Sequence, residues 1–97
     1  MYVRVTQFDY DPAREEELFR IVDDHVFPAM KALPGFQSFT SGSDREAKRG
    51  VSITGWNDMD HAAGFREALG GLIQQLEDAG ASFEPAQLYE ITRHVTG

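Results

Sequence analysis

The sequence of 97 residues contains no cysteine, which excludes disulfide bonds, thiol catalysis and metal sites built from thiolates. Basic residues are also scarce. Lys and Arg number 9 against 16 Asp and Glu, the formal net charge is -7, and Lys48–Arg49 is the one adjacent basic pair. Because nucleic acids and anionic membranes are bound by clustered cations, we expect neither as a partner.

Long hydrophobic runs are missing too. No stretch approaches the ~20 apolar residues that cross a bilayer, and the N-terminus lacks the basic and apolar regions of a signal peptide. The composition, 41% hydrophobic and 26% charged, is typical of a globular protein. We therefore expect one cytoplasmic domain, residues 1–97. A domain of this size has a thin stability margin, which favours association with a second copy.

Four segments have the alternation or the β-branched and aromatic content of strands. They are Tyr2 to Tyr10, Phe36 to Ser43, Val51 to Trp56 and Gln87 to Val95.

The first predicted helix begins at Asp11–Pro12, where Asp11 can cap the free amides and Pro12 suits the first turn. Its apolar stripe has three- and four-residue spacing and consists of Leu18, Ile21, Val22, His25, Ala29 and Leu33. Pro28 should kink this helix or begin a second short segment, and Pro34–Gly35 should end it.

The second predicted helix follows Asn57–Asp58, with Asp58 as the expected cap, and ends at Gly80. Its buried stripe comprises Ala62, Phe65, Leu69, Leu72, Ile73 and Leu76. Gly70–Gly71 interrupts the stripe at a cost of about 1 kcal/mol per glycine, which indicates a bend or the close approach of another backbone.

The order strand–helix–strand–strand–helix–strand predicts an α+β fold of the ferredoxin-like βαββαβ type, with an antiparallel four-stranded sheet and two helices on one face. We expect the helices to pack on Val3, Val5, Val51 and Ile53. The opposite face would carry Phe8, Trp56 and either Phe36 or Phe39. Such an aromatic face is usually covered. A homodimer with its two sheets packed together would cover it.

Three features resemble the dimeric α/β-barrel superfamily, in particular its antibiotic-biosynthesis-monooxygenase-like domains. They are Leu33–Pro34–Gly35–Phe36 after the first helix, Trp56 at the end of the third strand and Asp58 at the start of the second helix. The resemblance covers nearly the whole chain in the order and length of its elements.

The resemblance implies one of several activities. Some members are cofactor-independent oxygenases of phenols and quinols, some bind and degrade haem, and others have no assigned activity. The haem-degrading members use an Asn, a Trp and a helical His. Trp56 matches the Trp, Gln7 stands near the Asn position, and Arg66 stands near the His position, while His61 comes too early. The resemblance therefore favours oxidation without a cofactor over haem degradation.

The candidate catalytic residues are Trp56, Gln7, Arg66 and His25. Trp56 can stack on a flat ligand, and its alternative role is to fill the core of the dimer. Arg66 and Arg4 can stabilise a phenolate or carboxylate, or else form surface or interface contacts. His25 can act as a general base, or else bond a carbonyl released by Pro28.

The candidate ligand-binding residues are mostly aromatic: Trp56, Phe8, Phe39, Phe65, Tyr89 and Arg4. We expect no metal site, because the spacing of the Asp and His residues matches no known set of ligands.

Three hypotheses about function follow. The first is a cofactor-independent monooxygenase that acts on a phenolic or quinol-like small molecule. The second is a non-catalytic dimeric protein that binds a small aromatic ligand or fills the same space with side chains. The third is another reaction of the superfamily, such as isomerisation or decarboxylation, which needs no oxygen.

Overall fold

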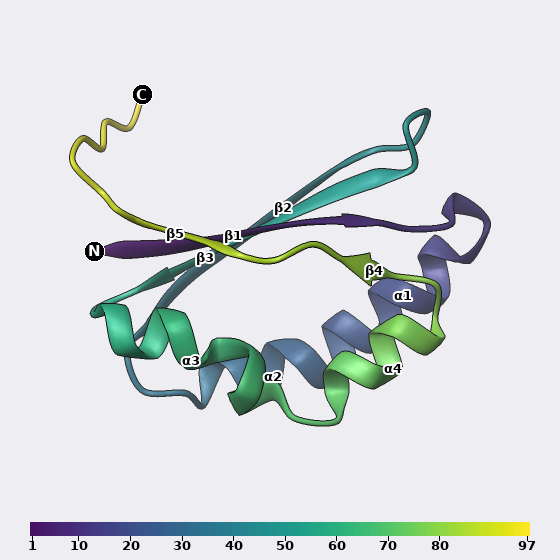
Figure 1. Cartoon of the computed structure of the whole chain (residues 1–97), viewed down its shortest axis with the longest axis horizontal. Helices are drawn as coiled ribbons and strands as arrows, with labels where there is room; N and C mark the ends of the chain where they lie inside the picture. Colours follow the sequence, from purple (N-terminus) through teal and green to yellow (C-terminus); the bar gives the residue numbers. More distant parts are fainter.

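The computed structural model describes residues 1–97 and has a single antiparallel sheet. Its long strands are β1 (Tyr2–Asp9), β2 (Phe36–Asp44) and β3 (Arg49–Trp56), in the order β2-β3-β1. Two short strands, β4 (Ser82–Phe83) and β5 (Gln87–Glu90), pair with the other edge of β1 (Figure 1). Together they occupy the place of a fourth strand. The ferredoxin-like α+β fold predicted from the sequence is confirmed.

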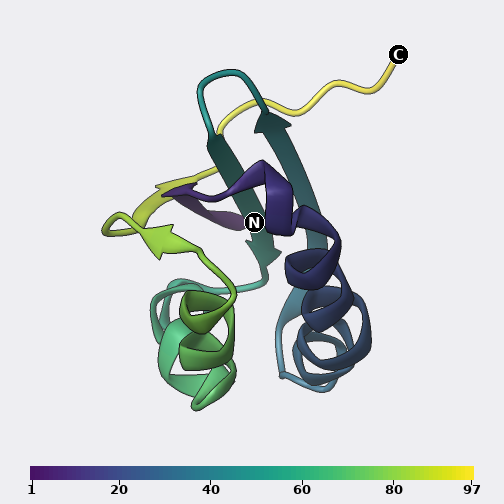
Figure 2. The same cartoon turned by 90° about the vertical axis from the view of Figure 1, so that its right-hand side faces the viewer.

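All helices lie on one side of the sheet (Figure 2). The first helical region consists of a 3-10 turn (Pro12–Arg14), α1 (Glu15–Ile21), a π-helical segment (Val22–Val26) and α2 (Phe27–Lys31). The second consists of α3 (Met59–Leu69) and α4 (Leu72–Asp78). None of these helices is long and apolar enough to cross a membrane.

The predicted start and interruption of the first helical region are confirmed. The Asp11 side chain accepts a hydrogen bond of 2.9 Å from the Ala13 amide. A second segment, α2, begins at Phe27, and Pro28 is its second residue. The backbone is helical through this point, with φ -72° and ψ -47° at Val26, and the π-helical segment accommodates the N–H that Pro28 lacks. The wide turn before it shifts the side chains around the helix axis. Val26 is therefore buried and His25 exposed, so the predicted place of His25 on the apolar stripe is wrong.

The predicted assignment of the two sheet faces is also wrong. Aromatic residues of the sheet face the helices: Phe39 lies 5.0 Å from Phe27 of α2, and Trp56 lies 5.2 Å from Phe65 of α3, between ring centroids. Rings bury more apolar area than β-branched side chains do, so packing them inside stabilises the fold more.

Phe36 and Phe39 lie on the same face, whereas the sequence placed them on opposite faces. A register shift between Phe36 and Ser38 causes this, because Phe36 pairs with Trp56 and Phe39 with Thr54. An extra residue in one strand reverses the alternation of all residues beyond it. The bulge thus adds a second phenylalanine to the core.

The other face of the sheet is uncovered in the single chain. We call it the open face, and it carries Val3, Val5, Val51, Ile53, Gln7 and Tyr89. The four aliphatic side chains are only half-buried, and Tyr89 is 50% exposed. The β2–β3 hairpin and the C-terminal segment rise beside this face (Figure 1).

The last strand ends at Glu90, and the predicted extension to Val95 is wrong. Glu90 pairs with Tyr2, and the Ile91 amide donates a bond of 2.9 Å to the Met1 carbonyl. Because the neighbouring strand begins there, residues 92–97 have no strand of their own chain to pair with. Between the second helix and this strand, the short β4 was not predicted.

Candidate functional site

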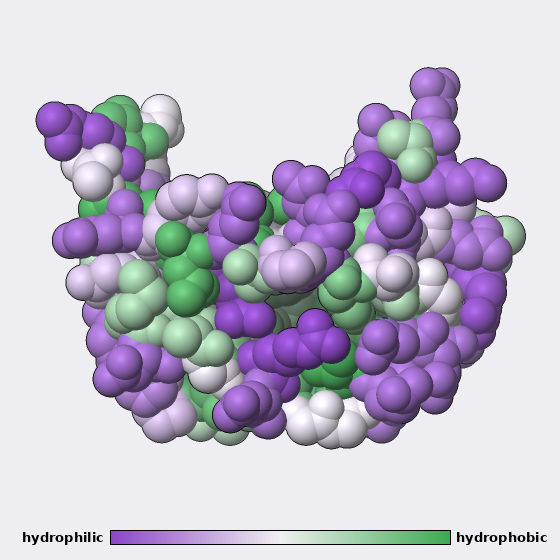
Figure 3. Space-filling model, in the orientation of Figure 1, coloured by the Kyte–Doolittle hydropathy of each residue, from purple (hydrophilic) through white to green (hydrophobic).

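A cavity of about 120 Å³ lies between the sheet and the helices, and this volume suits a single aromatic ring. Figure 3 shows the surface hollowed between the two layers, with hydrophilic residues around the opening. The cavity walls are mainly apolar. Hydrophobic residues of the wall include Phe8, Leu18, Phe19, Val22, Val26, Phe39, Phe65, Leu69, Ile73, Leu76, Ala81 and Phe83.

Alternation along β1 gives the sheet side of the cavity, with Arg4, Thr6 and Phe8 pointing the same way. Phe8 pairs with Gly50, and a Cβ on Gly50 would come within 2.4 Å of the Phe8 ring. The missing side chain at Gly50 therefore leaves room for Phe8, which also packs on Phe83 at 5.5 Å. A glycine in β3 thus helps to place an aromatic wall of the cavity.

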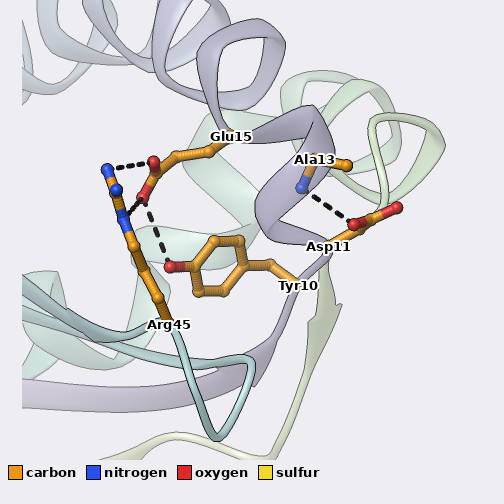
Figure 4. A network of polar contacts seen from close by, with 5 residues as sticks. All are labelled: Tyr10, Asp11, Ala13, Glu15 and Arg45. Atoms are coloured by element: carbon orange, nitrogen blue, oxygen red, sulfur yellow. Dashed lines mark hydrogen bonds and ion pairs between the residues drawn. The ribbon is translucent and has the colours of Figure 1, made fainter.

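A polar network fixes the helix side of the cavity (Figure 4). The buried Tyr10 donates its hydroxyl to Glu15 Oε1 at 3.3 Å, and Arg45 of the β2–β3 turn binds both oxygens of the same carboxylate. This network ties α1 to the hairpin. Since Leu18 and Phe19 of α1 line the cavity, it also holds that wall in place.

Two arginines supply positive charge to the cavity. Arg4 Nη1 donates to the carbonyls of Ala62 and Ala63 in α3, at 3.1 and 3.2 Å. Arg66 lies one turn further along α3, and neither guanidinium has a carboxylate partner in the chain. Burial and the nearby charge of Arg66 lower the pKa of Arg4, although an arginine stays charged at neutral pH. An anion in the cavity would therefore be stabilised by two cations.

The remaining polar groups of the cavity come from the sheet and from its edge next to β4. They are Thr6, Ser41, Ser52 and Glu84. Glu84 binds Arg49 at 3.0 Å, so its negative charge is already partly neutralised from outside the cavity. No group of three or more His, Asp or Glu residues is arranged to hold a metal ion.

The structure brings together some of the residues proposed from the sequence. Arg66, Arg4, Phe8, Phe39 and Phe65 all line the cavity. They come from β1, β2 and α3, far apart in the chain.

Four other candidates lie elsewhere. Trp56 is buried behind the cavity with 1% exposure, and its Nε1 donates to Thr54 Oγ1 at 2.8 Å. Gln7 and Tyr89 lie on the open face, where Gln7 accepts a bond from Arg49. His25 is exposed on the π-helical segment. The structure does not bring these four side chains into contact with the cavity.

Sequence reasoning missed part of the cavity wall, including Phe19, Phe83 and Glu84. Phe19 lies off the predicted apolar stripe, and Phe83 and Glu84 follow a helix in a segment with no predicted strand. One signal for the cavity was present in the sequence: alternation along the first strand places Arg4, Thr6 and Phe8 on the same face. The prediction turned this face away from the helices, and the structure turns it toward them.

No family model and no curated protein sequence matches this chain. Several solved structures do match its fold. SnoaB, a cofactor-independent oxygenase from Streptomyces nogalater, has 22% identity and a TM-score of 0.72, with 99% of this chain and 97% of SnoaB covered. HapK from Hahella chejuensis has 14% identity and a TM-score of 0.77, with 100% of both chains covered.

A candidate antibiotic biosynthesis monooxygenase from Deinococcus radiodurans has 15% identity and a TM-score of 0.73, with 99% of this chain and 97% of that chain covered. At these identities the likeness is one of fold. The antibiotic-biosynthesis-monooxygenase-like resemblance predicted from the sequence is confirmed at that level.

Proposed function

We propose that this chain, which has an antibiotic-biosynthesis-monooxygenase-like fold, oxidises a phenolic or quinol-like small molecule without a cofactor. One observation carries the proposal: the cavity joins aromatic walls to two arginines that have no carboxylate partner. Such a site suits a flat ring that carries a negative charge. SnoaB, which is described as a cofactor-independent oxygenase, shares the fold and adds support.

The proposed chemistry converts a phenol to a quinone. Loss of the hydroxyl proton gives a phenolate, which Arg66 stabilises, and the electron-rich ring then reacts with O₂. O₂ adds to a ring carbon that carries hydrogen, and the C–H and O–O bonds then break. One oxygen atom becomes the new carbonyl, the other leaves as water with the protons of the hydroxyl and the C–H, and the substrate supplies all four electrons. Glu84 is the one carboxylate that lines the cavity, so we assign it as the proton acceptor in place of His25.

Oxygen consumption with a panel of hydroquinones and polyphenols tests this proposal. We expect the wild-type protein to exceed the buffer rate, and Arg66→Gln and Glu84→Gln to lose most of the excess. Arg20→Gln is the matched control, because Arg20 is exposed on α1, pairs with Glu16 and does not line the cavity. Uptake no faster with protein than without it, across the panel, would overturn the proposal.

The second candidate function is ligand binding without turnover. It is favoured by the absence of histidine from the cavity wall and by the engagement of Glu84 with Arg49. Saturable binding of an aromatic ligand with no consumption of oxygen would support it. Turnover of that ligand without oxygen would instead point to an isomerase or decarboxylase.

We also propose that the chain forms a homodimer through the open face. The aliphatic residues Val3, Val5, Val51 and Ile53 form a connected apolar strip across two paired strands. A second copy, sheet against sheet, would bury this strip. The partner face is thus aliphatic, where the sequence predicted an aromatic one.

A further inference from the structure

The Arg4 guanidinium uses only some of its hydrogen-bond donors within the protein. Nη1 donates to the Ala62 and Ala63 carbonyls, which uses both of its hydrogens and fixes the side chain against α3. The edge formed by Nε and Nη2 carries the remaining donors, and no protein group accepts from it. Arg4 is thus held in place while its two parallel N–H donors are unused.

Other arginines of this chain show what that edge binds. Arg45 Nε and Nη2 contact the two oxygens of Glu15 at 3.3 and 2.5 Å (Figure 4), and Arg14 Nε and Nη2 contact Glu17 at 3.2 and 3.0 Å. A carboxylate matches the spacing of the two donors and accepts both bonds. A phenolate offers a single oxygen and does not match this geometry.

We propose that the natural ligand carries a carboxylate in addition to its reacting hydroxyl, and that this carboxylate binds the Nε–Nη2 edge of Arg4. The proposal rests on the proposed function and assigns a different role to each of the two arginines. Arg66 stabilises the reacting oxygen, and Arg4 selects an aromatic hydroxy acid over a neutral phenol. Arg4 is then a residue that determines specificity.

The size and charge of the cavity agree with this division. About 120 Å³ admits one ring, so the two arginines lie near substituents of the same ring. Arg66 is exposed to solvent, whereas Arg4 is partly buried, so a phenolate held by Arg66 would leave the partly buried charge of Arg4 uncompensated. A ligand with a carboxylate and a phenolate compensates both.

A pair of probe ligands tests the proposal by calorimetric titration. One is a dihydroxybenzoate with its hydroxyls para to each other, and the other is the corresponding dihydroxybenzamide, which has nearly the same shape and no carboxylate charge. We expect the wild-type protein to bind the acid about tenfold or more tightly than the amide. Equal affinities, or no measurable binding of the acid, would overturn the proposal.

Variants then assign the preference to a residue. Arg4→Gln should abolish it, Arg4→Lys should keep only part of it because Lys lacks the planar fork, and Arg66→Gln should weaken both ligands while the preference persists. Arg20→Gln should leave it unchanged. A preference that survives in folded Arg4→Gln, or that disappears only in Arg66→Gln, refutes the role of Arg4. If Arg4→Gln does not fold, Arg4→Lys replaces it as the test variant, because lysine keeps a donor for the Ala62 carbonyl.

Oxygen uptake separates this inference from the proposed function. If hydroquinone and the dihydroxybenzoate are oxidised with equal kcat/KM, the oxygenase stands and the carboxylate preference falls. If the acid binds selectively through Arg4 and no oxygen is consumed, the preference stands and the oxygenase falls.

Discussion

At the scale of single residues, burial divides the aromatic side chains into two roles. Phe8, Phe39 and Phe65 line the cavity, whereas Trp56 lies one layer deeper, against Phe36 and Phe65. The Trp56 indole N–H is already satisfied by the buried Thr54 hydroxyl. Its stacking surface and its donor are both occupied within the protein, so its position favours a role in stability.

Replacement of Trp56 by phenylalanine should therefore affect folding more than binding. We expect Trp56→Phe to lower the free energy of unfolding by about 1–3 kcal/mol, because it leaves a small void and an unpaired Thr54 hydroxyl. Urea unfolding followed by circular dichroism measures the loss. In a Thr54→Val background the same replacement should cost less, because the hydroxyl is absent. An affinity loss of tenfold at unchanged stability would instead place Trp56 in the site.

Asp58 gives a prediction for pH. It caps α3 by accepting the His61 amide at 2.9 Å, and it also bonds the His61 ring. The amide bond, followed by the bond to the ring, lowers the pKa of Asp58 from its usual 3.8. Since the folded pKa lies below the unfolded one, this stabilisation is present above about pH 4 and is lost as the pH falls through the folded value.

The variant Asp58→Asn should therefore be less stable at neutral pH and should show a shallower loss of stability below about pH 4. Thermal unfolding of both proteins from neutral to acidic pH checks this. Asp60→Asn, two residues further along the chain and without a capping bond, is the control. Parallel curves for wild type and Asp58→Asn would contradict the assignment.

At the scale of elements, backbone geometry next to Pro28 and at Gly70 decides where the two helical regions change. The π-helical segment ahead of Pro28 turns His25 outward, and Gly70 separates α3 from α4. Gly70 has a φ of +56°, and Gly71 has a helical φ of -65°. The predicted bend is confirmed, while nothing lies within 4 Å of a Cβ added at either glycine. The bend thus arises from backbone conformation and not from a close approach.

The two neighbouring glycines should respond in opposite ways to alanine. Gly70→Ala should destabilise the protein by about 1–2 kcal/mol, because a side chain disfavours positive φ. Gly71→Ala should stabilise it by about 0.4–1 kcal/mol, because it restricts the unfolded chain at no cost in the folded one. Each variant is the control for the other in urea unfolding. Equal effects of the same sign would show that φ is not the cause.

At the scale of the whole molecule, one face of the sheet is covered by helices and the other is open. The open face is flanked by the β2–β3 hairpin and the C-terminal segment, both of which extend past the sheet (Figure 1). Residues 92–97 also lack a pairing strand in their own chain. A small domain with an uncovered apolar strip gains stability from a second copy.

A charge in that strip should separate the proposed dimer. We expect wild-type protein to have the mass of two chains by light scattering at micromolar concentration, and Ile53→Glu to have the mass of one. The cost arises from burying an unpaired carboxylate between two sheets. Met59→Glu, which adds the same charge to an exposed position at the start of α3, on the helix side and outside the cavity wall, should leave the dimer intact. A single-chain mass for the wild type would count against the dimer.

The sequence by itself determined the order of the elements, the antiparallel sheet, the caps at Asp11 and Asp58 and the break at Gly70. These depend on local backbone preferences and on the period of apolar residues, which a single chain segment expresses. It also nominated Arg4, Arg66, Phe8, Phe39 and Phe65. It did so through residue type and family resemblance.

Only the tertiary structure decided which face of the sheet meets the helices. Alternation places Arg4, Phe8 and Trp56 on one face of the sheet, but it does not say whether that face meets the helices. The bulge after Phe36 and the π-helical segment before Pro28 also change which side chains share a face, and neither has a strong local signal in the sequence. Three-dimensional packing resolved this symmetry by burying the aromatic rings. It thereby placed the two arginines inside a cavity, left Trp56 in the core, and turned Gln7, His25 and Tyr89 away from it.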